Sequence, residues 1–109
     1  MKDERVYMLN VLWFREDGGE ERFQDYWKLA FPMIESVGGR KLKSFEPQRA
    51  LEGDFDADLI FFVEYPNFEA FKKFANSPEH HNLAFMKKEA VENSLLVRCA
   101  RPEKRSVSH

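Results

Sequence analysis

Three segments of the chain show the alternation of a β-strand and are apolar on both faces. They are Val6–Phe14, Leu59–Tyr65 and Leu95–Ala100. In each segment one set of alternate positions is uniformly apolar, and the other set is interrupted by a single polar residue: Asn10, Glu64 or Arg98. Successive side chains of a strand point to opposite faces. Both faces of the sheet are therefore predicted to be apolar and to pack against helices, a partner subunit or a ligand.

Residues 21–37 carry apolar side chains at the three- and four-residue spacing of an amphipathic helix. Gly38 and Gly39 follow, and glycine readily takes the left-handed conformation in which helices end. Pro32 lies inside this segment. Since proline lacks an N–H group and its ring clashes with the preceding turn, we expect it to bend the helix or to split it.

A second helical region, residues 68–91, follows the Leu59–Tyr65 strand. Asn67 is the expected N-cap, and Ser77-Pro78 restarts the helix with a cap and a first-turn proline. A weaker strand, residues 41–51, precedes the Leu59–Tyr65 strand. Pro47 lies within it, which fits an edge strand.

The order of these elements is β-α-β-β-α-β, which is the order of the ferredoxin-like fold. The predicted fold class is therefore α+β: a four-stranded antiparallel sheet with the helices on one face and the first strand between the third and the fourth. We expect the helices to cover the uncharged face, which includes Tyr7 and Phe61. The bare face would carry Asn10, Glu64 and Arg98. A bare apolar face predicts an interface, and two such sheets around a two-fold axis would close into a dimeric α/β barrel.

Length and composition limit the classes of function. The chain has 109 residues, so one ferredoxin-like domain over residues 1–100 is expected, followed by a polar, disordered tail over residues 101–109. Its 17 basic and 19 acidic side chains give a net charge of −2, which provides no electrostatic footprint for nucleic acid or an anionic membrane. No apolar run is long enough to cross a bilayer. The charged N-terminus does not resemble a signal peptide, and the single Cys99 suits a reducing compartment, so we expect a cytoplasmic protein.

Five short motifs, in their order and spacing, resemble those of a known family. They are Tyr26-Trp27, Gly38-Gly39-Arg40, Leu51-Glu52-Gly53-Asp54, Glu64-Tyr65-Pro66 and Ser77-Pro78-Glu79. Over residues 6–100 the chain resembles the bacterial family called domain of unknown function 1330, within the dimeric α/β-barrel superfamily. The resemblance implies a ferredoxin-like protomer, a dimer, and a pocket between sheet and helices or inside the barrel. It implies no particular reaction.

Two positions depart from the pattern of that family. Its members commonly have Tyr where this chain has His80, and Arg where this chain has Lys87. Lysine keeps the positive charge but loses the planar, bidentate fork of arginine. His80 follows the Ser77 cap and is a candidate titrating group in the pocket, the alternative being a solvated pair with His81.

The polar residues of the sheet are the other candidates for chemistry. Glu64 is a candidate general base, and Arg98 could stabilise an enolate or a carboxylate of the substrate. The alternative is an ion pair between Glu64 and Arg98 that fixes the register of a dimer. The candidate ligand-binding residues are Asn10, Arg40, Trp27 and Lys87.

We predict neither a metal site nor a cofactor. Asp54, Asp56 and Asp58 alternate, but the remaining ligands of a calcium loop are missing. Three hypotheses of function follow. The first is a homodimeric small-molecule-binding protein, with cofactor-free isomerase or lyase chemistry on a small organic acid or aromatic metabolite through Glu64, Arg98 and His80. The second is a non-catalytic dimeric module, and the third is a haem or oxygen-dependent monooxygenase.

Overall fold

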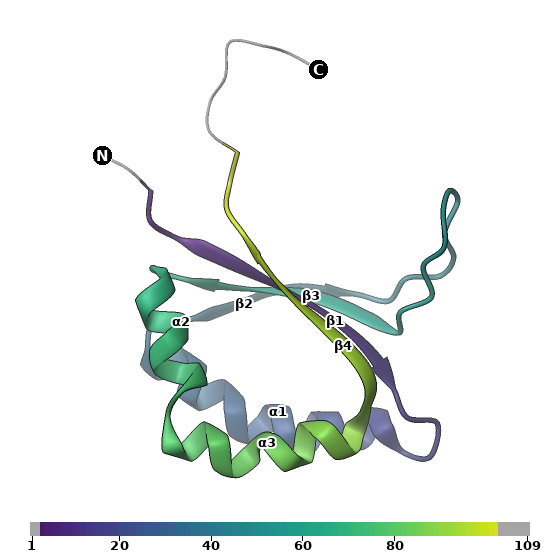
Figure 1. Cartoon of the computed structure of the whole chain (residues 1–109), viewed down its shortest axis with the longest axis horizontal. Coiled ribbons are helices and arrows are strands. Elements are labelled where there is room, and N and C mark those ends of the chain that lie inside the picture. Colours follow the sequence, from purple (N-terminus) through teal and green to yellow (C-terminus); the bar gives the residue numbers. More distant parts are fainter. Residues whose placement is uncertain (1–2, 103–109) are drawn as a thin grey trace.

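The structure is a computed structural model, and it describes residues 3–102. Figure 1 shows a single sheet with helices on one side of it. The elements are β1 (Val6–Phe14), α1 (Gly19–Ser36), β2 (Arg40–Phe45), β3 (Leu59–Tyr65), α2 (Phe68–Ala75), α3 (Pro78–Ala90) and β4 (Val91–Cys99). The four strands are antiparallel in the order β2-β3-β1-β4. The predicted ferredoxin-like architecture is thereby confirmed, whereas most of the predicted tail, residues 103–109, lies outside the described residues.

The second helical region consists of two helices, α2 and α3, and the Ser77 side chain caps the second one as predicted. The elements differ from the predicted ones at three places. β4 starts at Val91 rather than at Leu95, directly after α3. α1 runs through Pro32 without a break. Pro32 is exposed, so water can bind the carbonyl group that its missing N–H leaves free. β2 ends at Phe45, which leaves Pro47 in the following loop.

The strand register overturns the predicted composition of the two faces. The pairs that decide this are Asn10–Phe61, Met8–Arg98 and Tyr7–Glu64. Directly paired residues of an antiparallel sheet share a face. Asn10 and Arg98 therefore lie on the helix-covered face, and Glu64 lies on the open face. The prediction that all three share the open face was wrong, because alternation within a strand does not reveal its phase relative to the neighbouring strand.

The hydrophobic core lies between the helix-covered face and α1. Leu12 of β1 and Phe61 of β3 are fully buried there. α1 contributes the apolar stripe that its sequence predicts: Phe23, Tyr26, Ala30 and Ile34 are all buried. Each large apolar side chain in such a core contributes about 1.5–3 kcal/mol of stability.

The end of α1 approaches the sheet closely. Gly38 has a φ of 88° and its N–H donates to the Glu35 carbonyl, so this glycine ends the helix as predicted. A Cβ atom on Gly39 would collide with Ile34 and press against the Tyr65 ring. The glycine pair therefore sets the distance between α1 and β3.

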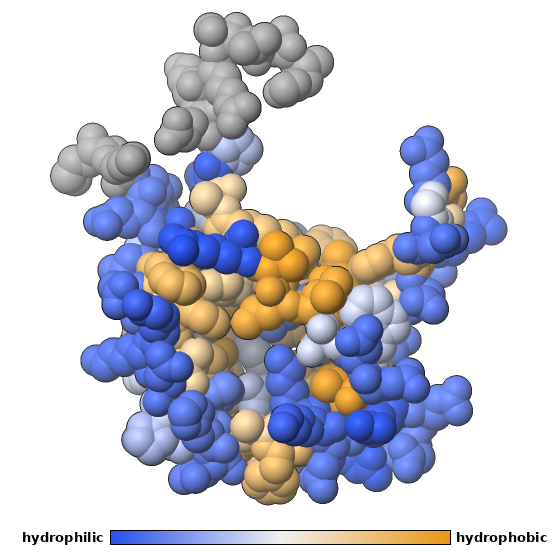
Figure 2. All heavy atoms as spheres, in the orientation of Figure 1, coloured by the Kyte–Doolittle hydropathy of each residue, from blue (hydrophilic) through white to orange (hydrophobic). Residues whose placement is uncertain are grey.

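The open face of the sheet remains apolar. Its apolar residues are Tyr7, Leu9, Val11, Trp13, Leu42, Phe45, Ile60, Phe62, Leu95, Val97 and Cys99. Phe45 is 61% exposed, Leu95 is 48% exposed and Val97 is 42% exposed. Figure 2 shows apolar atoms gathered over the sheet, and the loop between β2 and β3 projects beyond it on the side away from the helices (Figure 1). Among the described residues, no helix combines the length and the hydropathy that a membrane span needs.

Candidate functional site

A cavity of about 90 Å³ lies between the helix-covered face of the sheet and the three helices. Figure 2 shows the molecule hollowed between the apolar sheet and the polar outer surface of the helices. Most of the lining is apolar or aromatic. The polar side chains that reach it are Asn10, Tyr26, Tyr65, His80 and Lys87.

Tyr26 and His80 form a hydrogen bond inside this cavity, with 2.8 Å between Tyr26 Oη and His80 Nε2. Tyr26 is fixed by its place in the buried stripe of α1. His80 lies in the first turn of α3, where its backbone N–H donates to the Ser77 hydroxyl at 3.2 Å. The cap that starts α3 thus also places the imidazole opposite Tyr26.

The surroundings of His80 favour its neutral form. Burial lowers the pKa of His80 and outweighs the hydrogen bond to the Ala75 carbonyl, which acts in the opposite direction. The positive charge of Lys87 lowers this pKa further. The other ring nitrogen, Nδ1, lies 3.3 Å from the Ala75 carbonyl oxygen. A carbonyl only accepts hydrogen bonds, so Nδ1 carries the proton and donates it. Nε2 is then left as the acceptor for the Tyr26 hydroxyl.

Tyr26 stays protonated. Burial raises its pKa to about 12, so near neutral pH the phenol is a donor and its oxygen also offers lone pairs to a ligand. A ligand hydroxyl that donates to Tyr26 Oη is thereby connected to His80 through a chain of two hydrogen bonds. This arrangement can move a proton between a ligand and a basic nitrogen.

Lys87 brings a cationic group to the same cavity. It follows His80 by seven residues, which is about two helical turns, so both side chains lie on one side of α3. No acidic side chain lines the cavity, and none forms an ion pair with Lys87 within the described part of the chain. Burial lowers the pKa of Lys87. A negatively charged ligand would supply the partner that this amine lacks.

Asn10 and Trp27 complete the set of predicted residues that line the cavity. The Asn10 amide donates to the Met8 carbonyl at 3.2 Å. The Trp27 ring packs edge-on against Phe61, with 5.1 Å between centroids. Trp27 therefore belongs both to the core and to the cavity wall.

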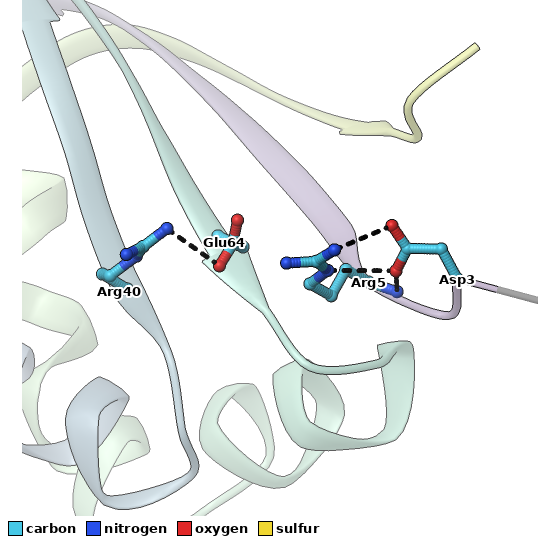
Figure 3. A network of polar contacts seen from close by, with 4 residues as sticks. All are labelled: Asp3, Arg5, Arg40 and Glu64. Carbon is cyan, nitrogen blue, oxygen red and sulfur yellow. Dashed lines mark hydrogen bonds and ion pairs between the residues drawn. The ribbon is translucent and has the colours of Figure 1, made fainter.

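The remaining predicted site residues lie outside the cavity. Glu64 forms an ion pair with Arg40 of β2, with 3.3 Å between the charged groups (Figure 3). Arg98 stacks over the Phe68 ring at 4.1 Å. Glu64 and Arg98 therefore do not face each other, and the predicted pairing of these two residues was wrong. Glu64 has a structural partner, but on the neighbouring strand of its own sheet.

Sequence reasoning missed the role of Tyr26 as a polar group of the cavity. It lies in an apolar helical stripe, and nothing in that spacing separates a core tyrosine from one whose hydroxyl has a partner. The only signal was its place in the Tyr26-Trp27 motif. No group of three or more His, Cys, Asp or Glu side chains within residues 3–102 is arranged to hold a metal ion.

Comparisons with solved structures place this geometry among ferredoxin-like proteins. A protein of unknown function from Rhodopseudomonas palustris is 27% identical, with a TM-score of 0.83 over 95% of this chain and 86% of that one. A dimeric ferredoxin-like protein of unknown function from Jannaschia is 17% identical, with a TM-score of 0.68 over 88% and 98% of the two chains. A hydroxynitrile lyase from Passiflora edulis is 11% identical, with a TM-score of 0.72 over 95% and 99%.

No protein of curated function matches the sequence. The family comparison, in contrast, covers most of the chain. Residues 15–99 match the family described as a domain of unknown function, DUF1330. This stretch includes α1, α2, α3 and three of the strands, and with them the Tyr26–His80 hydrogen bond. The chain therefore belongs to the DUF1330 family, as the five motifs of its sequence predict.

Proposed function

We propose that this protein is a homodimeric small-molecule-binding enzyme that performs cofactor-free proton transfer, as in an isomerase or a lyase. The observation that carries this proposal is the Tyr26–His80 hydrogen bond inside a largely apolar cavity. A partly buried histidine held neutral, with one nitrogen oriented by a carbonyl and the other facing a hydroxyl, has the arrangement of a general base. Glu64 and Arg98 have no part in this mechanism.

The proton moves along the two hydrogen bonds. A ligand hydroxyl gives its proton to Tyr26 Oη, while Tyr26 gives its own proton to His80 Nε2. His80 becomes an imidazolium whose Nδ1–H is already held by the Ala75 carbonyl. The ligand oxygen becomes negative, and the Lys87 ammonium stabilises that charge in largely apolar surroundings. When the base instead attacks an acidic C–H group, Nε2 is again the final proton acceptor.

The size and charge of the cavity select the class of ligand. An engineered cavity of about 150 Å³ in another protein binds benzene, whereas this one measures about 90 Å³. The volume favours a small organic acid of a few heavy atoms over an aromatic metabolite, and Lys87 favours a carboxylate. A haem group is far too large for this cavity, so nothing in its geometry favours the haem form of the monooxygenase hypothesis.

The structural neighbours are consistent with this proposal at the level of the fold. One of them is named a hydroxynitrile lyase, so the fold supports a lyase in at least that protein. At 11% identity this likeness does not transfer a substrate. It supports the shared fold alone.

The homodimer is proposed from the open face. A contiguous apolar sheet face that includes Leu95, Val97 and Phe45 is costly to leave in water. Two neighbours with this fold are described as dimeric. Two open faces packed together would form a barrel, with the candidate site of each protomer on the outer side of its sheet.

The proposal is tested by binding and by proton exchange with ligands of two to four carbons. Candidate 2-hydroxy and 2-oxo acids are titrated against ¹⁵N-labelled protein, and exchange of the ligand C–H groups with D₂O is followed by NMR. We expect at least one ligand to shift the His80 signals and to exchange faster with the protein. His80→Gln should abolish the acceleration, and His81→Gln, an exposed neighbour, should retain it. Equal acceleration by the two variants, or no binding by the whole panel, would contradict the proposal.

A further inference from the structure

We propose that Lys87 Nζ forms an imine with a small aldehyde or ketone in the cavity, and that the Tyr26–His80 pair then removes a C–H proton from the bound ligand. The imine is a covalent intermediate and requires a carbonyl compound as the ligand, whereas acid–base chemistry alone requires neither. This proposal rests on the proposed function for its proton transfers, whereas the imine itself requires only the amine and the cavity.

The geometry brings the amine to the same space as the acid–base pair. Lys87, His80 and Tyr26 all line the one cavity. Side chains of a helix lean toward its N-terminus, so the long Lys87 chain extends back along α3 in the direction of His80.

The surroundings of Lys87 suit a nucleophile. An ammonium group has no lone pair and cannot attack a carbonyl carbon, so an imine-forming lysine needs access to its neutral form. A carboxylate partner would hold the charge on the amine, and none lines this cavity. Burial among aromatic side chains favours the neutral form, and the pKa of Lys87 is lowered accordingly.

The reaction balances without any cofactor. After Lys87 loses one proton, its lone pair attacks the carbonyl carbon and the C=O bond electrons move to oxygen. The oxygen is protonated and the nitrogen gives up a second proton, which yields a neutral carbinolamine whose nitrogen again has a lone pair. The hydroxyl then takes a second proton and leaves as water, and the nitrogen lone pair forms the C=N bond. The ammonium and the carbonyl compound are thereby converted into an iminium and one water. No atom is oxidised or reduced.

The iminium explains how one site would join binding to catalysis. The iminium keeps a positive charge at the position of the Lys87 ammonium. It also withdraws electrons from the ligand carbon that is bonded to the C=N carbon. A C–H group on that carbon becomes acidic enough for a neutral imidazole to remove its proton. His80 Nε2 is the base that the cavity offers, directly or through Tyr26.

Lys88 provides a matched control within the same short fragment. It is the next residue along α3, and it is exposed whereas Lys87 is partly buried in the cavity wall. Cleavage after Glu79 and Glu89 releases residues 80–89, in which Lys87 and Lys88 are the only lysines. Label on the two amines can therefore be compared in a single peptide by fragmentation.

The test is reductive trapping of the intact protein at pH 7. Sodium cyanoborohydride is added with acetaldehyde or with pyruvate as the probe, and the 80–89 peptide is analysed by mass spectrometry. Because the neutral fraction of an amine rises as its pKa falls, we expect at least about fivefold more label on Lys87 than on Lys88. A naphthaldehyde probe, which is too large for the cavity, should reverse this preference. Unfolding in urea should remove it.

Variants separate failure of this inference from failure of the proposed function. Lys87→Arg should lose the trapped product while circular dichroism shows an intact fold, and Lys88→Arg should keep it. His80→Gln should keep trapping at Lys87 but lose C–H exchange of the probe. Label on Lys87 no greater than on Lys88 with both small probes would overturn the imine and leave the acid–base function standing. Preferred trapping without any exchange that depends on His80 would overturn the proposed function alone.

Discussion

Tyr26 and His80 are 54 residues apart in the sequence and share a 2.8 Å hydrogen bond inside a small cavity. The bond joins α1 to α3, so it depends on the packing of the two helices against each other. Its direction follows from the Ala75 carbonyl, which takes the Nδ1 proton of His80 and leaves Nε2 as an acceptor. The predictions below address this bond, the amine beside it and the open face of the sheet.

Tyr26→Phe removes the hydroxyl but keeps the ring of the buried stripe. We expect a loss of about 1 kcal/mol in the free energy of unfolding, because His80 Nε2 loses its partner. C–H or O–H proton exchange of any bound ligand should fall by at least about a hundredfold if the hydroxyl relays the proton. Urea denaturation and NMR exchange measure the two effects. A variant with unchanged exchange would show that His80 acts without Tyr26.

The pH dependence of stability should report on His80. Burial lowers its pKa in the folded protein, while in the unfolded chain the pKa is about 6.5. Between these two values the unfolded state binds more protons, so the free energy of unfolding falls as the pH decreases through this window. Below the folded pKa the contribution of His80 levels off.

This titration can be isolated by substitution. His80→Gln should flatten the fall in stability below pH of about 6.5, whereas His81→Gln should leave the fall in place. Urea denaturation of the three proteins at closely spaced pH values provides the measurement. Parallel curves for the native protein and His80→Gln would contradict the neutral, buried histidine.

Lys87→Met should stabilise the protein and abolish its activity. Burial lowers the pKa of Lys87, which means that the folded state holds the charged amine at a cost at pH 7. Methionine fills a similar volume without that cost, and we expect a gain of about 0.5–1 kcal/mol. Lys88→Met, on the exposed side of the same helix, should change stability by less than about 0.5 kcal/mol. A destabilised Lys87→Met variant would mean that the amine has a structural partner.

The sequence predicted the fold well because each element carries a local signal. The α1 stripe, the Gly38 stop and the Ser77 cap each depend on neighbours a few residues away. The order of the strands in the sheet could be predicted as well, because the order of elements along the chain is compatible with few topologies of a split β-α-β unit.

The two faces of the sheet could not be predicted in the same way. Every strand is apolar on both sides, so shifting the phase of β3 by one residue changes no hydrophobic pattern. The pairing of Tyr7 with Glu64, rather than the alternation, decides the face. The candidate site was predicted only in part. His80, Lys87, Asn10 and Trp27 line the cavity as predicted. The hydrogen-bond partner of His80 was missed, because it comes from a helix whose apolar spacing indicates core packing alone.

The open face gives a last prediction, because β4 offers two adjacent leucines with nearly equal exposure on opposite faces. Leu95 is 48% exposed on the open face, and Leu96 is 50% exposed on the helix side beside the cavity. Leu95→Glu would place a charge in the middle of the proposed dimer interface, whereas Leu96→Glu would not. Sedimentation velocity measures the oligomeric state, and we expect the native chain and Leu96→Glu to be dimers. Leu95→Glu should be a monomer, or its dimer should dissociate at least about a hundredfold more readily. The reason is that a buried unpaired charge costs several kcal/mol. Equal dissociation of the two variants would show that the open face is not where the copies meet.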